Sequence, residues 1–431
     1  MDEEGQLAVL QYSVKDSIRV VREAPVPGSS MPAAGSVDER ALSGTVTCTF
    51  PVDSEFAEYK GAVRNGTPHG KGVLTFRNGK VYDGMFQNGK ADGEMTITFA
   101  DGDTCEQYKG AMMDDQIHGR GVLTFKNGNV CDGMFQNGKP DGQVTITYAA
   151  GDRRREFKGM MKKGRSIGHG VFTLKDGEVH SGMFQNNQAN GQMTITYTAG
   201  DRRSEYKGTM KDGKRHGHGV VTFKNGMVWD GMFQNGEASG VMTITYATGD
   251  ERSEYKGTMK DGKRHGHGVV TFKDGEVWNG MFENGEASGA MTKTYTAGDR
   301  RRKYKGTMKD GKRHGHGVVT FKNGMVWDGM FQNGEANGQM TIAYADGDQC
   351  KKYKGSMKGG KRHGHGVLTF TNGEVHSGMF ENGQFTGAIN SSDSQRGHDA
   401  HRPPAAARPA QDGSDAAWDT VMQLAGLGGG K

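Results

Sequence analysis

Proline, cysteine and long apolar runs are all scarce in this chain of 431 residues. Only 9 prolines are present and the glycines follow no triplet pattern, which excludes a collagen-like rod. No apolar run approaches the ~18 residues of a membrane-spanning helix. The hydrophobic fraction of 33% is low for one large core, so ordinary globular domains are not expected.

The cysteines and the chain ends carry no targeting or disulfide signal. Four cysteines (Cys48, Cys105, Cys131 and Cys350) form neither a CxxC pair nor a dense framework. The first ten residues are acidic where a signal peptide is basic, Asp2 stands where myristoylation requires glycine, and no prenylation box is present. We therefore expect a cytoplasmic protein, with peripheral contact to a membrane or the cytoskeleton left open.

Glycine is the residue in excess, with 71 copies. Many glycines with few prolines indicate many turns and closely approaching strands. The net charge of +5 is too small for a dedicated nucleic-acid binder, so no nucleic-acid partner is expected.

A block of 49 residues repeats along the chain. An aromatic residue precedes Lys-Gly at the start of each of seven blocks: Tyr59, Tyr108, Phe157, Tyr206, Tyr255, Tyr304 and Tyr353. Residues 206–238 and 304–336 are identical. Each block has two halves, and a leading half-copy begins at Gly44. The sequence therefore divides into an acidic segment and linker (1–43), a repeat array (44–390) and a tail (391–431).

Each block predicts β-hairpins. In the block that starts at Tyr206, runs of five to seven strand-forming residues alternate with Asn-Gly, Asp-Gly and Ser-Gly turns. Side chains alternate along a strand, so Trp229, Gly231 and Phe233 share one face, and the glycine leaves room for a neighbouring ring. The predicted packing or partner face contains Tyr206, Trp229, Phe233, Tyr255, Trp278, Phe282, Tyr304, Trp327 and Phe331.

The fold class follows from stacking these hairpins. One hairpin buries too little surface to be stable, whereas stacked hairpins bury surface against their neighbours and are stable together. We predict an all-β fold, an elongated and twisted single antiparallel sheet of consecutive hairpins. Met210, Met232 and Met242 also recur at strand positions, where they serve either packing or an adaptable binding face.

The pattern Y-x-G-x-x-x-x-G-x-x-H-G-x-G resembles the MORN (membrane occupation and recognition nexus) repeat. The first half-block carries it on Tyr206, Gly208, Gly213, His216, Gly217 and Gly219. The second half carries equivalent positions on Trp229, Gly231, Phe233, Asn235, Gly236 and Gly240. The resemblance covers about residues 44–390. It implies one elongated, curved antiparallel sheet, and scaffolding or targeting roles that are often near membranes or the cytoskeleton.

The chain departs from the family pattern in three ways. No fused catalytic or membrane-anchoring domain is expected, although such repeats are fused to lipid kinases, methyltransferases or membrane anchors in relatives. Its second halves have Ala238, Ser239 and Gly240 where the first halves have the His-Gly element. At the position of Tyr82, other blocks have Cys131, His180 and His376 instead of an aromatic residue.

Paired histidines recur in HGHG tetrads. They are His216/His218, His265/His267, His314/His316 and His363/His365. Each tetrad offers two ligands, zinc needs three or four, and the next tetrad lies ~19 Å away at sheet spacing. We therefore favour turn and strand-edge residues over metal ligands, and we expect no cofactor.

Basic turns also recur. The repeated positions are Lys211, Lys214, Arg215, Lys260, Lys263, Arg264, Lys309, Lys312 and Arg313. They fit either contact with anionic phospholipid headgroups or a solvated edge that prevents aggregation between sheets.

Both flanking segments contain helical periodicity. Leu7, Leu10, Val14, Ile18 and Val21 predict either a short amphipathic helix that caps the first sheet edge or an extended segment. The tail is expected to be disordered apart from a short helix at 414–425. Trp418, Val421 and Met422 share one face of that helix, which is either an end cap or a motif for a protein partner.

No constellation of catalytic residues appears in the sequence. It contains no P-loop and no nucleophile elbow, and Asp201 and Glu205 lie in a repeated open loop. The sequence therefore predicts a non-enzymatic scaffold that binds protein partners, with a peripheral module for anionic phospholipids as the alternative. Open sheet ends also make a homodimer conceivable.

Overall fold

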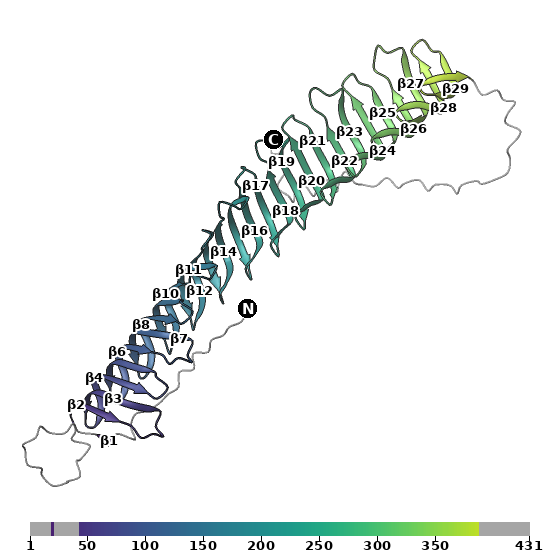
Figure 1. Cartoon of the computed structure of the whole chain (residues 1–431). Helices are drawn as coiled ribbons and strands as arrows, with labels where there is room; N and C mark the ends of the chain where they lie inside the picture. Colours follow the sequence, from purple (N-terminus) through teal and green to yellow (C-terminus); the bar gives the residue numbers. More distant parts are fainter. Residues whose placement is uncertain (1–18, 21–42, 388–431) are drawn as a thin grey trace, which may run out of the picture.

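The computed structural model describes residues 19–20 and 43–387, and these form one antiparallel sheet of 30 strands without a helix. Each strand pairs with its neighbours in sequence, from β1–β2 to β29–β30. Figure 1 shows the hairpins stacked along an elongated rod, from the purple N-terminal strands to the yellow-green C-terminal ones. The prediction of an all-β sheet of consecutive hairpins is confirmed.

The strands of the N-terminal segment (β1), the leading half-copy (β2) and blocks one to three come first. They are β1 (Arg19–Val20), β2 (Gly44–Thr49), β3 (Phe56–Arg64), β4 (Thr67–Phe76), β5 (Val81–Gln87), β6 (Lys90–Thr98), β7 (Cys105–Met113), β8 (Gln116–Phe125), β9 (Val130–Gln136), β10 (Lys139–Thr147), β11 (Arg154–Lys162), β12 (Arg165–Leu174), β13 (Val179–Gln185) and β14 (Gln188–Thr196).

Blocks four to seven supply the remaining strands. They are β15 (Arg203–Lys211), β16 (Lys214–Phe223), β17 (Val228–Gln234), β18 (Glu237–Thr245), β19 (Arg252–Lys260), β20 (Lys263–Phe272), β21 (Val277–Glu283), β22 (Glu286–Thr294), β23 (Arg301–Lys309), β24 (Lys312–Phe321), β25 (Val326–Gln332), β26 (Glu335–Ala343), β27 (Cys350–Lys358), β28 (Lys361–Phe370), β29 (Val375–Glu381) and β30 (Gln384–Gly387).

Two-residue turns close the hairpins on one edge of the sheet. Asp212 and Gly213 join β15 to β16 with φ values of 49° and 73°, and Asn235 and Gly236 join β17 to β18 with 53° and 96°. Two successive residues at positive φ match the right-handed twist of the strands they connect, and Asx-Gly is the sequence that adopts them. The sequence signal for hairpins therefore acts through these turns, which we call the Asx-Gly edge.

A bulge interrupts each of these hairpins near its turn. Between the pairs Gly208↔Gly219 and Met210↔Arg215, a single residue of β15 faces three residues of β16. The middle one, Gly217, has a φ of +65°, which favours glycine. The β17–β18 hairpin has the same shift around Gly240, so the two halves of a block share one geometry despite their different sequences.

The inner face of the sheet, which carries Tyr206, Trp229, Phe233 and their equivalents, holds the core. Tyr206 pairs with Val221, and its ring lies over the backbone of Gly219, where an added Cβ would be 2.5 Å from the ring carbon Cε2. Its hydroxyl donates to the Thr209 carbonyl at 2.7 Å, and its ring meets Phe233 edge-on at 5.9 Å. The aromatic and glycine positions thus interlock across neighbouring strands.

At the N-terminal end, the backbone of residues 19–20 is extended and pairs with β2. The choice between a helix and an extended segment stays a prediction, because Leu7, Leu10, Val14, Ile18 and Val21 lie outside the described residues. So do the predicted tail helix and its Trp418, Val421 and Met422. Within the described ranges, no helix is long and apolar enough to cross a bilayer.

Candidate functional site

Most residues of the predicted aromatic face are buried in the core of the sheet. Tyr206, Tyr255 and Tyr304 are fully buried, and Phe233, Phe282 and Phe331 are almost so. Trp229, Trp278 and Trp327 are half-buried and pack against the same core. The Trp278 indole donates to Glu276 at 2.5 Å. These rings build the rod, and only the tryptophans keep some exposed surface.

The opposite, outer face presents a regular ladder of side chains. In block four, cross-strand pairing places Lys207, Val220, Asp230 and Thr243 side by side on β15 to β18. The next block repeats this row from Lys256 onwards. Lys207 and Asp230 in this row are exposed, and Val220 and Thr243 are half-buried, so solvent reaches the charged side chains of this face.

A row of methionines runs beside this ladder. Met232 lies opposite His218 and is 41% exposed, and equivalent methionines recur every 49 residues. The exposed members of the row are Met85, Met134, Met183, Met232, Met330 and Met379, and Met281 is half-buried.

The sequence analysis did not distinguish the exposed methionines of this row from the methionines of the core. Met210 and Met242 are buried, so packing is correct for them, whereas Met232 lies on the outer face. The signal was available, because Met232 lies between Gly231 and Phe233, which both face inward, and alternation sends it outward.

An open groove of about 600 Å³ lies on the outer face between blocks three and four. His169, Met183, Thr194, Lys207 and His218 contribute to its walls. Its other lining residues include Met193, Gln192 and Thr209, so the groove combines apolar and polar side chains.

The HGHG histidines lie inside strands, at the bulges. We expected turn or strand-edge positions; instead His216 and His218 belong to β16, because the bulge lets the strand continue past Gly217. His218 contacts Asp230 at 3.0 Å, and His316 contacts Asp328 at 2.9 Å. Within the described part of the chain, no group of three or more His, Cys, Asp and Glu residues could hold a metal ion.

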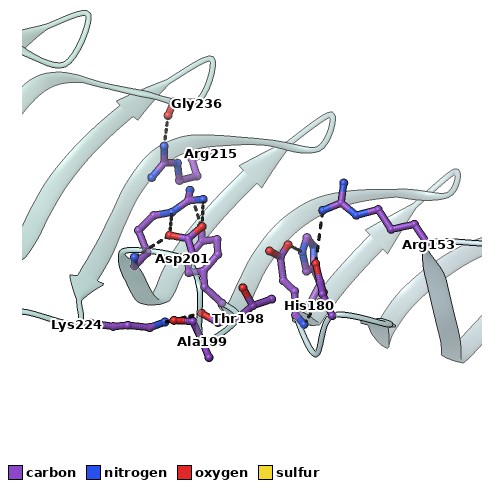
Figure 2. Close-up of polar contacts among 12 residues, drawn as sticks. Arg153, His180, Thr198, Ala199, Asp201, Arg215, Lys224 and Gly236 are labelled. Atoms are coloured by element: carbon purple, nitrogen blue, oxygen red, sulfur yellow. Dashed lines mark hydrogen bonds and ion pairs between the residues drawn. The ribbon is translucent and has the colours of Figure 1, made fainter.

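The basic turns divide into two kinds of residue. The six lysines are exposed at the Asx-Gly edge: Lys211, Lys214, Lys260, Lys263, Lys309 and Lys312. The arginines turn inward and are half-buried. Figure 2 shows Arg215 donating to the Gly236 carbonyl (2.6 Å), and its guanidinium also lies 5.1 Å from the Phe233 ring centroid.

The other two arginines repeat this contact. Arg264 and Arg313 bond Gly285 and Gly334 in the same way, and burial lowers the pKa of Arg313. The arginines therefore brace neighbouring turns, and the lysines are the residues free to meet an external anion.

The loops at the opposite edge are closed by internal ion pairs. Asp201 accepts two hydrogen bonds from the Arg203 side chain (3.0 and 2.7 Å), and these hydrogen bonds lower the pKa of Asp201 to about 2. Lys224 binds the carbonyls of Thr198 and Ala199 at 2.5 Å each, as Figure 2 shows. Glu205 pairs with Lys207 at 2.8 Å. Asp201 and Glu205 are thus each paired with a cation of their own strand or loop.

Comparison with known proteins identifies the repeats. The MORN repeat family matches nine segments of 23 residues: 59–81, 82–104, 108–130, 131–153, 157–179, 206–228, 255–277, 304–326 and 353–375. The first half of every block is matched, and the second half of blocks one and two.

Alsin, from several mammals, is one of the proteins to which this chain is similar. Human and chimpanzee alsin are 35% identical over 89 residues, which cover 20% of this chain and 5% of alsin. Mouse alsin is 34% identical over the same length. The match therefore spans a small fraction of those proteins.

Among solved structures, the TCP10 domain of zebrafish (Danio rerio) CPAP aligns with 72% of this chain and 99% of that domain. Its sequence identity is 12% and its TM-score is 0.14. The E1021V mutant of that domain gives the same values.

Proposed function

Because this chain is a MORN-repeat protein, we propose that it is a non-enzymatic scaffold that holds protein partners on the outer face of its sheet. MORN repeats are protein-interaction or membrane-targeting modules rather than a known enzyme family. That coarse role applies to the whole array, and the face and the kind of partner are our proposal.

The exposed methionine row carries this proposal. Methionine is flexible and polarisable, so it adapts to varied partner surfaces. One methionine per block gives a spacing of four strands, or ~19 Å at sheet spacing. The row runs along the array from Met85 to Met379. It therefore supports a partner that lies along the rod and contacts several blocks.

A methionine-substituted array tests the scaffold. We expect a triple variant (Met183→Gln, Met232→Gln and Met281→Gln) to lose the proteins captured by the tagged wild-type chain, with the same melting temperature. A matched triple variant of exposed residues at the starts of β18, β22 and β26 (Glu237→Gln, Glu286→Gln and Glu335→Gln) should keep them. Quantitative mass spectrometry of captured proteins is the measurement, and identical capture by all three chains would reject the outer face as the partner surface.

The exposed lysine pairs support a second candidate function, binding of anionic phospholipid surfaces. Lys211 and Lys214 lie opposite each other across one turn. The pair recurs in the following blocks, and each lysine near an anionic membrane contributes ~1 kcal/mol. Because the arginines are engaged internally, we assign this role to the lysines alone.

Vesicle co-sedimentation separates the two candidates. Under the lipid proposal, vesicles containing phosphatidylserine should pellet the chain, neutral vesicles should not, and about 0.5 M salt should abolish the effect. A variant with Lys211, Lys214, Lys260 and Lys263 changed to Gln should bind more weakly. If anionic and neutral vesicles pellet the chain equally, lysine-mediated targeting is rejected.

A further inference from the structure

The lysine of the outer ladder has an acidic neighbour in four blocks. A glutamate two residues earlier on the same strand forms an ion pair with it. The pairs are Glu58–Lys60 (2.9 Å), Glu156–Lys158 (2.8 Å), Glu205–Lys207 (2.8 Å) and Glu254–Lys256 (2.9 Å). In these blocks the outer face is locally neutral at this position.

Strands β23 and β27 break this rule by reversing the charge. Lys303 stands where β15 and β19 have glutamate, beside Lys305 on the same face of β23. On β27, Lys352 and Lys354 repeat the substitution. All four side chains are exposed, and no ion pair to any of them occurs within residues 43–387.

The strand neighbours of these lysines supply no compensating charge. Lys303 pairs with Thr294 and Thr320, and Lys352 pairs with Ala343 and Thr369. The face therefore carries two pairs of unneutralised lysines, four strands apart, which is ~19 Å at sheet spacing. This surface, which we call the lysine face, is confined to blocks six and seven.

We propose that the lysine face docks an extended, acidic segment of a protein partner, running along the rod with two clusters of carboxylates. An extended chain rises ~3.3 Å per residue, so a span of ~19 Å corresponds to clusters about six residues apart. The proposal rests on the scaffold function above and gives it a partner chemistry and a location.

The surface between the two lysine pairs favours a polypeptide over a bilayer. Asp328 of β25 lies on the same face between them, exposed and in contact with His316 at 2.9 Å. A membrane of uniform negative charge would meet this carboxylate, whereas a peptide has neutral residues to place over it. Met330 of β25, 41% exposed, provides an apolar contact for the segment between its acidic clusters, and Val367 of β28, 38% exposed, provides another beside Lys354.

The test is fluorescence anisotropy with the full chain and a labelled peptide. The probe has two Glu-Glu pairs whose centres are about six residues apart, and the control probe has Gln in place of Glu. We expect salt-sensitive binding of the acidic probe only. A double variant (Lys303→Glu and Lys352→Glu), which recreates the Lys–Glu pairs of β15 and β19, should bind about tenfold more weakly.

Two further variants control for net charge. Lys211→Glu with Lys260→Glu makes the same charge change on the Asx-Gly edge and should leave binding unchanged. Glu205→Lys with Glu254→Lys copies the lysine face onto β15 and β19 and should add a second site. Unchanged binding by the Lys303→Glu and Lys352→Glu variant, or equal loss by the edge variant, would overturn the proposal.

The outcome for this site is distinguishable from the outcome for the scaffold. If the acidic probe does not bind while capture still depends on the methionine row, the lysine face is not a docking site and the scaffold stands. If vesicles of 30% phosphatidylserine bind through Lys303 and Lys352 and the probe does not, the face contacts membranes and the inference is wrong. Probe binding without methionine-dependent capture supports the lysine face and rejects the methionine row.

Discussion

At the scale of single residues, the contact between a tyrosine ring and a glycine backbone sets the packing of each block. Tyr206 lies on Gly219, and the same contact joins Tyr255 to Gly268 and Tyr304 to Gly317. A side chain at the glycine would displace the ring, because backbone and ring already touch. In block three Phe157 replaces the tyrosine, and its ring makes the same contact with Gly170 without a hydroxyl.

Gly219→Ala tests this contact. We expect destabilisation of about 1–3 kcal/mol, because the added methyl group overlaps the Tyr206 ring. The local free energy of opening can be measured by hydrogen exchange of β15 and β16. Gly249→Ala is the control, since no atom lies within 4 Å of its added Cβ. Equal protection in the two variants would show that the ring has space to move.

The buried tyrosines also predict alkaline unfolding. Burial raises the pKa of Tyr206 to about 12, above the ordinary value of about 10 in the unfolded chain. The folded state holds this proton more tightly, so the stabilisation is complete below pH ~10 and is lost as the pH rises through ~12. Circular dichroism and phenolate absorbance should change together in that window. Ionisation near pH 10 with an intact sheet would contradict the burial of these hydroxyls.

At the scale of elements, the bulged hairpin explains which features could be predicted from the sequence. Asn-Gly and Asp-Gly turns depend on local residues, and they predicted the hairpins correctly. The Trp229-Gly231-Phe233 alternation is also local; Phe233 is buried and Trp229 is half-buried, and whether this face also binds a partner stays a prediction. The place of His216 within β16 depends on a bulge, and a bulge is defined by register against β15, which the local sequence does not specify. The inward direction of Arg215 follows from alternation with Gly219 and Val221, but its contact with Gly236 requires the adjacent hairpin.

The brace between adjacent turns gives a prediction at this scale. Arg215→Gln removes a charged donor from the Gly236 carbonyl, and we expect a loss of about 1–2 kcal/mol, since hydrogen bonds from charged groups contribute more than neutral ones. Hydrogen exchange should accelerate in the turn at 234–237. Lys214→Gln, at the exposed neighbouring position, should change stability by less than about 0.5 kcal/mol. If both variants melt alike, the arginine does not couple the hairpins.

At the scale of the whole molecule, contacts between strands are made with sequence neighbours, so the rod behaves as a one-dimensional stack. Stability should then be a sum over blocks and their interfaces. Each block ends in the same way in this part of the array: Glu205 precedes Tyr206, and Glu254 precedes Tyr255.

Deleting a whole block tests this additivity. Removal of residues 206–254 joins Glu205 to Tyr255 and preserves the Glu-Tyr junction. We expect a folded rod shorter by ~19 Å, four strands at sheet spacing, measurable by small-angle X-ray scattering. The denaturant dependence of unfolding should fall with the surface removed. Deleting only residues 206–228 removes the first half of block four and joins two second halves. If that chain still folds fully and cooperatively, the half-block and not the block is the unit of folding.

Every strand pairs with its neighbours in sequence in the same register, so the rod can lengthen or shorten during evolution by whole blocks. Residues 206–238 and 304–336 are identical and two blocks apart, so an exchange between them removes or adds whole blocks without changing any junction. Such a change shifts downstream surfaces along the rod in fixed steps and leaves their chemistry intact. Duplication or loss of a block therefore changes the distance between the lysine face and the N-terminal strands by one block length, and no residue of either surface has to change.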